Sequence, residues 1–348
     1  MVDSIFARDG SASTDWRLLA VVSAALSLVV AAVWIGTLVL SEDGLVRVRN
    51  SMGARVGSAA EFGWVPGDAP SGFLQLARPA PAAFASVASG FEADGVTGPG
   101  REFAAGLAYA RLLMSAPHRV DGPVLAPSYE TLLAIVHDGR GYCADFVKAF
   151  TGLASARGIA VRQWGIAFNG FGSGHTFNEV YDTGLRKWIM IDSFHSLYFV
   201  DPVSRLPLST LEVHDRLLAI DAAPSKIGLV RIAKSGFPFR SDELALDYYR
   251  RGMSQLWMVW GNNLFDYESS FAGRLEVHAH RALGQFIGIL TGDFPTIRIY
   301  PVGLSQRDYR ILVESRNTFI LSVVCLAMAT FLAFYVAVAL NRSRRGHR

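Results

Sequence analysis

The stretch that decides the fold is "GRGYCADFVKAF", residues 139–150. It places Cys143 directly after a glycine-containing turn, and Phe146, Val147 and later apolar residues then recur at helical spacing until Gly158. A thiol in the first helical turn faces free backbone N–H groups and the positive end of the helix dipole, which both favour the thiolate. The stretch therefore predicts a helix that begins at a reactive thiol, although a lone cysteine is more often a small buried hydrophobe.

Helices precede this stretch and strands follow it. Residues 101–116 and 128–138 show helical periodicity, and Ser128 and Gly139 stand where a cap and a stop are expected for the second of these segments. Three runs rich in β-branched and aromatic residues come next, separated by turns that contain glycine: 160–168, 175–181 and 187–194. Helices followed by an antiparallel meander predict an α+β fold.

The second and third of these runs predict a hairpin that brings His175 close to Asp192. Alternation places both side chains on one face of the sheet. A two-residue loop at 183–184, or a four-residue loop over 182–185, sets His175 directly opposite Asp192. A three-residue loop would instead set Ile191 opposite His175. Hairpin geometry thus favours a His–Asp dyad, close enough for a carboxylate to orient an imidazole.

Four motifs in this order carry a resemblance to a known family: "GYCADF" (141–146), "ARGIAVR" (156–162), "HTFNEV" (175–180) and "WIMID" (188–192). The region from 101 to about 200 resembles the transglutaminase-like branch of the papain-like cysteine enzymes. The resemblance implies that Cys143 is the nucleophile, that His175 is the general base and acid, and that Asp192 orients His175.

Two further residues come into consideration beside this triad. "SFHS" follows Asp192 where the family usually has a proline, so that His195 lies near the site, either with a role in it or as an ordinary loop residue. No residue upstream of Cys143 clearly matches the family's additional oxyanion donor. Tyr142 and the backbone N–H groups of the turn are the candidates for that role.

Glu179 shares the face of His175 in the expected register. It is either a carboxylate of the site or the ion-pair partner of Arg162 or Lys187. The chain has no CxxC or HExxH motif and no second cysteine outside the apolar run that holds Cys325. We therefore expect no metal site, no cofactor and no internal disulfide in the central domain.

Two uncharged apolar runs, 18–40 and 318–340, are each long enough to span a bilayer of about 30 Å. An arginine-rich tail follows the second run, which predicts cytoplasmic termini and an extracytoplasmic central domain. The Ala- and Gly-rich composition is typical of a bacterium with a GC-rich genome, so the expected location is the cytoplasmic membrane of such a cell. The net charge of +3 is unclustered outside the tail and gives no indication of nucleic-acid binding.

The expected organisation thus has seven parts. They are a cytoplasmic tail (1–17), a first span (18–40), a linker or cover segment (41–100), a transglutaminase-like core (101–204), a helical extension with a final strand (205–317), a second span (318–340) and a basic tail (341–348). Within the extension, 241–263 and 267–290 look like helices and 296–302 like a strand. The apolar stripe "SQLWMVWGNN" is expected to be a buried or membrane-apposed helix face, or else the lining of a cleft.

Two classes of function fit these observations. The first is a membrane-anchored hydrolase or acyl transferase that acts on a peptide or protein amide through a thioester on Cys143. The second is a non-catalytic scaffold that keeps the fold in order to bind an envelope protein or a polysaccharide assembly complex. The rate at which a thiol-directed probe labels Cys143 separates the two.

Overall fold

The computed structural model divides into two compact units, one of residues 1–44 and 313–348 and the other of residues 45–312. The residues that the structure describes are 10–40, 42–73, 79–90, 100–172, 174–219, 227–261, 264–279 and 281–345. The tail expected at 1–17 and the basic tail at 341–348 lie partly outside these ranges.

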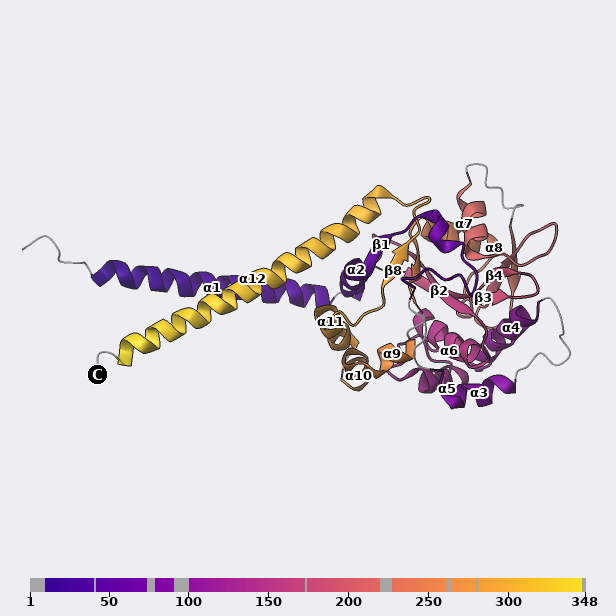
Figure 1. Ribbon diagram of the computed structural model, residues 1–348, viewed down its shortest axis with the longest axis horizontal. Coiled ribbons are helices and arrows are strands. Elements are labelled where there is room, and N and C mark those ends of the chain that lie inside the picture. Colours follow the sequence, from indigo (N-terminus) through magenta and orange to yellow (C-terminus); the bar gives the residue numbers. More distant parts are fainter. Residues whose placement is uncertain are drawn as a thin grey trace, which may run out of the picture. The chain divides into compact units, whose positions relative to one another are not determined.

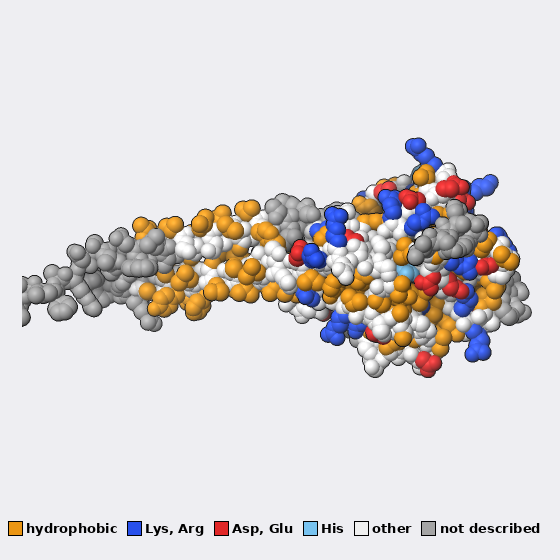
Figure 2. Space-filling model, turned by 90° about the horizontal axis from the view of Figure 1, so that it is seen from above, with side chains coloured by type: hydrophobic (Ala, Val, Ile, Leu, Met, Phe, Trp, Pro, Cys, Tyr) orange, Lys and Arg blue, Asp and Glu red, His pale blue; other side chains and the backbone are white. Residues whose placement is uncertain are grey.

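The first unit consists of α1 (Gly10–Leu40) and most of α12 (Gln306–Arg345). Residues Gln306–Ala339 form a helix long and apolar enough to cross a membrane, and Phe331 and Phe334 are among its exposed large apolar side chains. This helix contains nearly all of the second predicted span. Figure 2 shows hydrophobic side chains over the surface of the described part of this unit. In α1, the described apolar stretch Val21–Trp34 is shorter than the roughly 20 residues that a span needs, so the first span stays a prediction.

The second unit is built around a six-stranded sheet in the order β1-β8-β7-β2-β3-β4 (Figure 1). Its strands are β1 (Ala54–Val56), β2 (Val161–Ala167), β3 (Gly174–Asp182), β4 (Lys187–Ile191), β7 (Leu256–Val259) and β8 (Ile297–Ile299). The pair β1–β8 is parallel, and the other pairs are antiparallel. The meander β2–β3–β4 agrees with the predicted strands, whereas β1, β7 and β8 come from segments outside 101–204. A separate two-stranded sheet joins β5 (Leu197–Val200) to β6 (Gly228–Arg231).

Helices cover both faces of the sheet (Figure 1). One face carries α3 (Ala82–Ser89), α4 (Arg101–Leu113), α5 (Ser128–Asp138) and α6 (Cys143–Ala156), and the other carries α7 (Thr210–Leu218) and α8 (Asp242–Met253). Because successive strand residues point to opposite faces, each strand contributes side chains to a core on either side of the sheet. On β3, Val180 joins the core beneath α6, and Phe177 joins the core that contains Tyr249 of α8.

The turn between α5 and α6 requires the glycine that the sequence provides. Gly139 ends α5 in the left-handed conformation with φ of 66°, and a Cβ at this position would lie 1.7 Å from the backbone oxygen of His118. The same turn is tied to the strand-like residue Val120, whose N–H donates to the Gly139 carbonyl at 3.0 Å. The predicted boundary between the two helices is therefore confirmed.

The helix predicted over 241–263 is wrong in its second half. The helix α8 ends at Met253, and Leu256–Val259 is strand β7, which lies between β2 and β8. A short continuous apolar run fits a buried strand as well as a helix, so periodicity alone did not separate them. The second predicted helix, 267–290, is divided among α9 (Leu264–Ser269), α10 (Phe271–His278) and α11 (Arg281–Thr291).

The register of the β3–β4 hairpin also differs from the prediction. Asp182 pairs with Lys187 and Asn178 with Ile191, so the four-residue loop covers 183–186. This moves β4 by two positions relative to the register that would set His175 opposite Asp192. The Asp182 carboxylate accepts a hydrogen bond from the Leu185 N–H at 2.8 Å and shapes this loop. Since the period of a strand is two, the shift leaves every side chain on the expected face.

The remaining elements lie before α3. Helix α2 (Glu42–Gly53) leads into β1, and a short 3-10 helix η1 (Ala59–Phe62) follows that strand. Phe62 of η1 is fully buried and stacks on Trp164 of β2, with ring centroids 5.6 Å apart. These residues of the expected cover segment thus contribute to the core on the α7–α8 face.

Candidate active site

The nucleophile candidate Cys143 is the first residue of α6 and is half-buried. The carboxylate of Asp145 accepts hydrogen bonds from the N–H of Tyr142 at 2.9 Å and from the N–H of Val124 at 3.2 Å. These bonds hold the entry of the chain into the helix, so that the thiol lies at the helix N-terminus as the sequence predicts. The helix dipole there favours a negative sulfur.

The surroundings of Cys143 promote its ionisation. Burial alone would raise the pKa of the thiol, but the hydrogen bond and charge of His175, together with hydrogen bonds from the backbone and side chain of Thr176, outweigh burial. The pKa of Cys143 is therefore lowered from its ordinary value. A thiolate is the reactive form of cysteine, so this shift prepares the sulfur for attack on an electrophile.

The imidazole of His175 connects the sulfur to Asp192. Its Nε2 lies 2.5 Å from Oδ2 of Asp192, and both side chains are almost completely buried. Because Nε2 is used by the carboxylate, Nδ1 is the ring nitrogen left for the thiol. Burial opposes the charge on His175, but the neighbouring Asp192 and then Cys143 raise its pKa to about 10. Burial would raise the pKa of Asp192, but the charge of His175 outweighs burial and holds that pKa well below its ordinary range.

The dyad forms along a diagonal of the hairpin and not between directly paired residues. β4 ends at Ile191, and Asp192 opens a turn in which its backbone N–H and carbonyl both bond to Leu197, at 2.9 and 3.0 Å. Diagonal neighbours on one face of a sheet remain within reach of long side chains. The predicted proximity of His175 and Asp192 is thus present, although the direct pairing expected for them is wrong.

A second histidine lies against the first. The ring of His195 stacks on the ring of His175 with centroids 4.0 Å apart and planes 18° apart, and the backbone N–H of His195 donates to Oδ1 of Asp192 at 2.8 Å. Burial and the charge of His175 lower the pKa of His195. The cluster therefore favours one charged imidazole, His175, beside one neutral imidazole.

A family model agrees with this arrangement: the model of the transglutaminase-like superfamily matches residues 105–193. These residues are a transglutaminase-like domain. The matched segment contains Cys143, His175 and Asp192, and it ends two positions before His195. Searches among curated proteins and among solved structures gave no significant match.

The structure adds a residue from outside the transglutaminase-like domain to the cluster. Tyr249 of α8 is fully buried, and its hydroxyl donates to Oδ2 of Asp192 and lies 3.0 Å from Nδ1 of His195. Burial and the charge of Asp192 raise the pKa of Tyr249 well above its ordinary value, which keeps the hydroxyl protonated as a donor. Sequence reasoning missed Tyr249, since nothing in its local pattern connects α8 to the hairpin.

A cation within the transglutaminase-like domain was also missed. The Arg119 guanidinium lies 4.1 Å from the ring centroid of Phe194 and donates to the Phe194 carbonyl at 2.6 Å. Its charge interacts with those of Asp192 and Cys143. The segment that carries Arg119 precedes the glycine turn, and the backbone bonds between Val120 and Gly139 help to place it beside the site.

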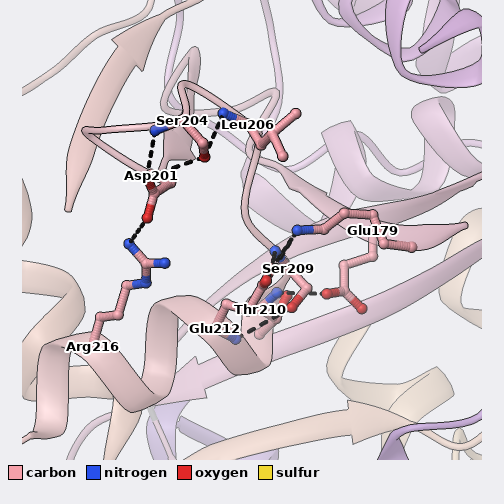
Figure 3. A network of polar contacts seen from close by, with 9 residues as sticks. Glu179, Asp201, Ser204, Leu206, Ser209, Thr210, Glu212 and Arg216 are labelled. Atoms are coloured by element: carbon pink, nitrogen blue, oxygen red, sulfur yellow. Dashed lines mark hydrogen bonds and ion pairs between the residues drawn. The ribbon is translucent and has the colours of Figure 1, made fainter. Parts of the chain in front are cut away.

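Of the two alternatives for Glu179, a carboxylate of the site or an ion-pair partner, the structure shows the ion pair with Arg162. One carboxylate oxygen accepts from Arg162 Nε at 2.7 Å and from the Trp164 indole N–H. The other oxygen accepts from the backbone N–H of Thr210 at 2.6 Å (Figure 3). The carboxylate thus forms a buried structural ion pair and is not part of the cluster around His175. Lys187 pairs with Glu212 instead, at 2.8 Å.

Tyr142 precedes α6 and exposes its side chain at the surface of the transglutaminase-like domain. Its backbone N–H already donates to Asp145. A role for Tyr142 in holding an oxyanion stays a prediction.

One group of side chains among the described residues is close enough to hold a metal ion. The ligand atoms of His175, Asp192 and His195 all lie within 4.8 Å of one another. In the structure these groups are bonded to each other and to Tyr249, and the thiol adjoins His175. This connectivity suits proton transfer between a sulfur and an imidazole that a carboxylate orients and stabilises.

Proposed function

We propose that the protein is a membrane-anchored, cysteine-dependent amide hydrolase or acyl transferase that works through a thioester on Cys143. The observation that carries this proposal is the continuous contact from the thiol through the His175 ring to the Asp192 carboxylate. The transglutaminase-like domain supports the same class of chemistry, since enzymes of this kind combine such side chains.

In the proposed reaction, the Cys143 sulfur forms a bond to the carbonyl carbon of the amide. The carbonyl oxygen takes up negative charge next to the N-terminal N–H groups of α6, which favour an anion there. The C–N bond then breaks, and the proton of His175 Nδ1 passes to the leaving amine. The product of this half-reaction is a thioester on Cys143 and a neutral His175.

The second half-reaction regenerates the thiolate–imidazolium pair. His175 takes a proton from water or from an incoming amine, whose oxygen or nitrogen attacks the thioester carbon. The C–S bond breaks, and a carboxylic acid or a new amide leaves. We rank hydrolysis ahead of transfer. Asp192 holds the imidazole ring of His175, and the Tyr249 hydroxyl holds the Asp192 carboxylate.

The proposed setting is the envelope of a bacterial cell. The C-terminal membrane-helix candidate supports membrane association, and the Arg-rich tail behind it supports cytoplasmic termini with the transglutaminase-like domain outside the cytoplasm. Deletion of 318–348, which removes the second span, tests whether 18–40 is an anchor. We expect the truncated chain to remain in membranes after alkaline extraction, held by 18–40. Its complete release would contradict a first span.

Thiol labelling tests the proposal directly. A Cys325→Ser background leaves Cys143 as the single thiol, and its reaction with iodoacetamide is followed from pH 5 to 9, in the folded and in the denatured chain. We expect faster labelling of the folded chain at pH 6–7 and loss of that excess in His175→Gln. Equal rates in the folded and denatured chains would reject the enzyme and favour the envelope scaffold.

A further inference from the structure

Helix α11 packs its glycine-containing side inward, against α10. Gly284, Gln285, Gly288 and Ile289 are buried. A Cβ on Gly284 would lie 2.5 Å from the backbone nitrogen of Glu276 in α10. The glycines therefore let the two helices approach closely, and the hairpin is held together by backbone contact and not by large apolar side chains.

The outer side of α11 is an apolar stripe. Leu283, Phe286, Ile287 and Leu290 recur at the spacing that places side chains on one face of a helix. Leu283 is 45% exposed and Leu290 is 51% exposed, and the two residues between them are half-buried. No charged residue follows Arg281 in this helix. The apolar face of a surface helix normally lies against the core, so the amphipathic pattern of α11 is inverted.

Phe271, the first residue of α10, extends this stripe. It is 59% exposed, and its neighbour Ala272 lies 3.5 Å from the position of a Cβ on Gly288 of α11. Phe271 therefore lies at the same end of the hairpin as the end of the α11 stripe. Arg274 and His278 are exposed on the same face of α10. Apolar groups flanked by basic ones are typical of helices that lie in a lipid interface.

Both connections to the first unit reach the second unit at one turn. Arg47 of α2 donates to the Asn169 carbonyl at 2.8 Å, and a Cβ on Gly170 would lie 2.6 Å from Ile311 of α12. Helix α2 begins two positions after α1 ends. About 10 Å of helix separate Ile311 from the apolar run that begins at 318. This turn therefore marks the part of the second unit nearest to the predicted spans along the chain.

The hairpin adjoins α2 and so lies close to this turn. Arg49 and Asn50 of α2 line one cavity together with Gly273 and Val277 of α10 (Figure 1). Helix α2 has only 12 residues, or about 18 Å of helix. The exposed stripe is thus connected to the predicted membrane boundary by a short, helical piece of chain.

We propose that the α10–α11 hairpin is an interfacial membrane-binding element, whose apolar stripe enters the same bilayer that holds the spans. Such helices bury their apolar face by roughly 5–10 Å at the boundary between head groups and acyl chains. The inference rests on the membrane association within the proposed function, and not on the chemistry of Cys143. The competing occupant is a second copy of the chain. The short connection to the apolar run of α12 favours the bilayer.

Fluorescence in vesicles tests the contact. In a Cys143→Ser/Cys325→Ser chain, Leu290→Cys is labelled with the dye NBD, and the full-length chain is reconstituted with phosphatidylcholine and phosphatidylglycerol. Some of the lipids carry a nitroxide near the head-group end of an acyl chain. Leu244→Cys in the same background is the matched control, because Leu244 of α8 is 52% exposed and lies outside the hairpin. We expect the nitroxides to quench the label at 290 at least about threefold more strongly.

Matched polar substitutions separate insertion from mere proximity. In the chain labelled at 290, Phe271→Gln together with Leu283→Gln removes two exposed apolar groups and should reduce quenching by about twofold or more. Leu244→Gln should leave the quenching unchanged. All three side chains are largely exposed, so circular dichroism should show an unchanged fold.

A label on the native Cys325, in the Cys143→Ser chain, reports separately on the second span. Quenching at 325 without an excess at 290 over 244 would overturn the interfacial hairpin and leave the anchor standing. Quenching at 290 but not at 325 would reject that anchor and keep the hairpin, and no quenching at either position would reject both. A blue-shifted label at 290 that the nitroxides do not quench would identify a second copy as the occupant and overturn the proposal.

Discussion

His175 and Asp192 form a 2.5 Å hydrogen bond although they are not partners in the β3–β4 ladder. The carboxylate belongs to the turn that follows β4, and it reaches the imidazole along the diagonal of the hairpin. Its position depends on the backbone bonds of that turn and on the donors around it, which include Tyr249 and the His195 N–H.

Asp192→Asn should leave the fold in place and disable the imidazole. An amide carries no charge to stabilise the imidazolium, so His175 loses the partner that raises its pKa. We expect the excess labelling rate of Cys143 near pH 7 to disappear, and turnover of any amide substrate to fall by about 10²–10⁴-fold. A variant that keeps the wild-type labelling profile would show that Asp192 does not act on His175.

Tyr249→Phe tests a positioning role for the hydroxyl. The change leaves the buried Nδ1 of His195 without its partner and removes one donor from Asp192, which should lower the free energy of unfolding by about 1–3 kcal/mol. A carboxylate with fewer donors is more basic, so the pH profile of Cys143 labelling should also shift.

Tyr248→Phe is the control for this experiment. Tyr248 also lies on α8 next to the same histidines, but its hydroxyl does not bond to Asp192 in the described contacts. A loss of stability in Tyr249→Phe with an unchanged pH profile would reduce Tyr249 to a structural residue.

The stability of the protein should depend on pH through His175. Its pKa is raised in the folded chain to about 10, from an unfolded value of about 6.5. Its contribution to stability is therefore fully present below pH 6.5 and is lost as the pH rises through 10. The difference in the free energy of unfolding between wild type and His175→Gln, measured by urea denaturation from pH 6 to 10.5, should shrink across this window. A difference that grows with pH would contradict the assigned charge.

The lowered pKa of Cys143 acts in the opposite direction. Its contribution is present above the unfolded value of about 8.5 and is lost as the pH falls through the folded pKa. Both Cys143→Ala and the double variant Cys143→Ala/His175→Gln lack this second titration. The difference between their free energies of unfolding therefore measures the contribution of His175 alone.

Arg162→Met should destabilise the protein without changing the site chemistry. It leaves the Glu179 carboxylate charged and buried, which costs about 3–5 kcal/mol. Lys187→Met, which breaks the more exposed pair with Glu212, should cost at most about 1 kcal/mol. Chemical denaturation measures both changes, and Cys143 labelling of the folded variants should match wild type. Slower labelling in Arg162→Met would connect the ion pair to the site.

The local pattern of the sequence was sufficient to predict α5, α6 and the meander β2–β4. Glycine stops and side-chain periodicity act over a few neighbouring positions, so they can be read without coordinates. They placed Cys143 at a helix start and His175 with Asp192 on one face. The cap expected at Ser128 is wrong, because Pro127 is the N-cap of α5 and the Ser128 hydroxyl donates to Glu268. The hairpin register was wrong by two residues, because the four-residue loop begins one position later than expected. The predicted proximity of His175 and Asp192 still holds, because a shift of two residues leaves both side chains on the same face of the sheet.

The sequence by itself therefore determined the order of the elements in the transglutaminase-like domain and the choice of the candidate thiol, imidazole and carboxylate. The tertiary structure alone decided that Tyr249 bonds to Asp192, that Arg119 lies beside the site, and that Trp257 belongs to a strand and lines a cavity. These relations join segments far apart in the chain through strand pairing and core packing. Such contacts depend on the combined shape of many side chains and not on the spacing within any one segment.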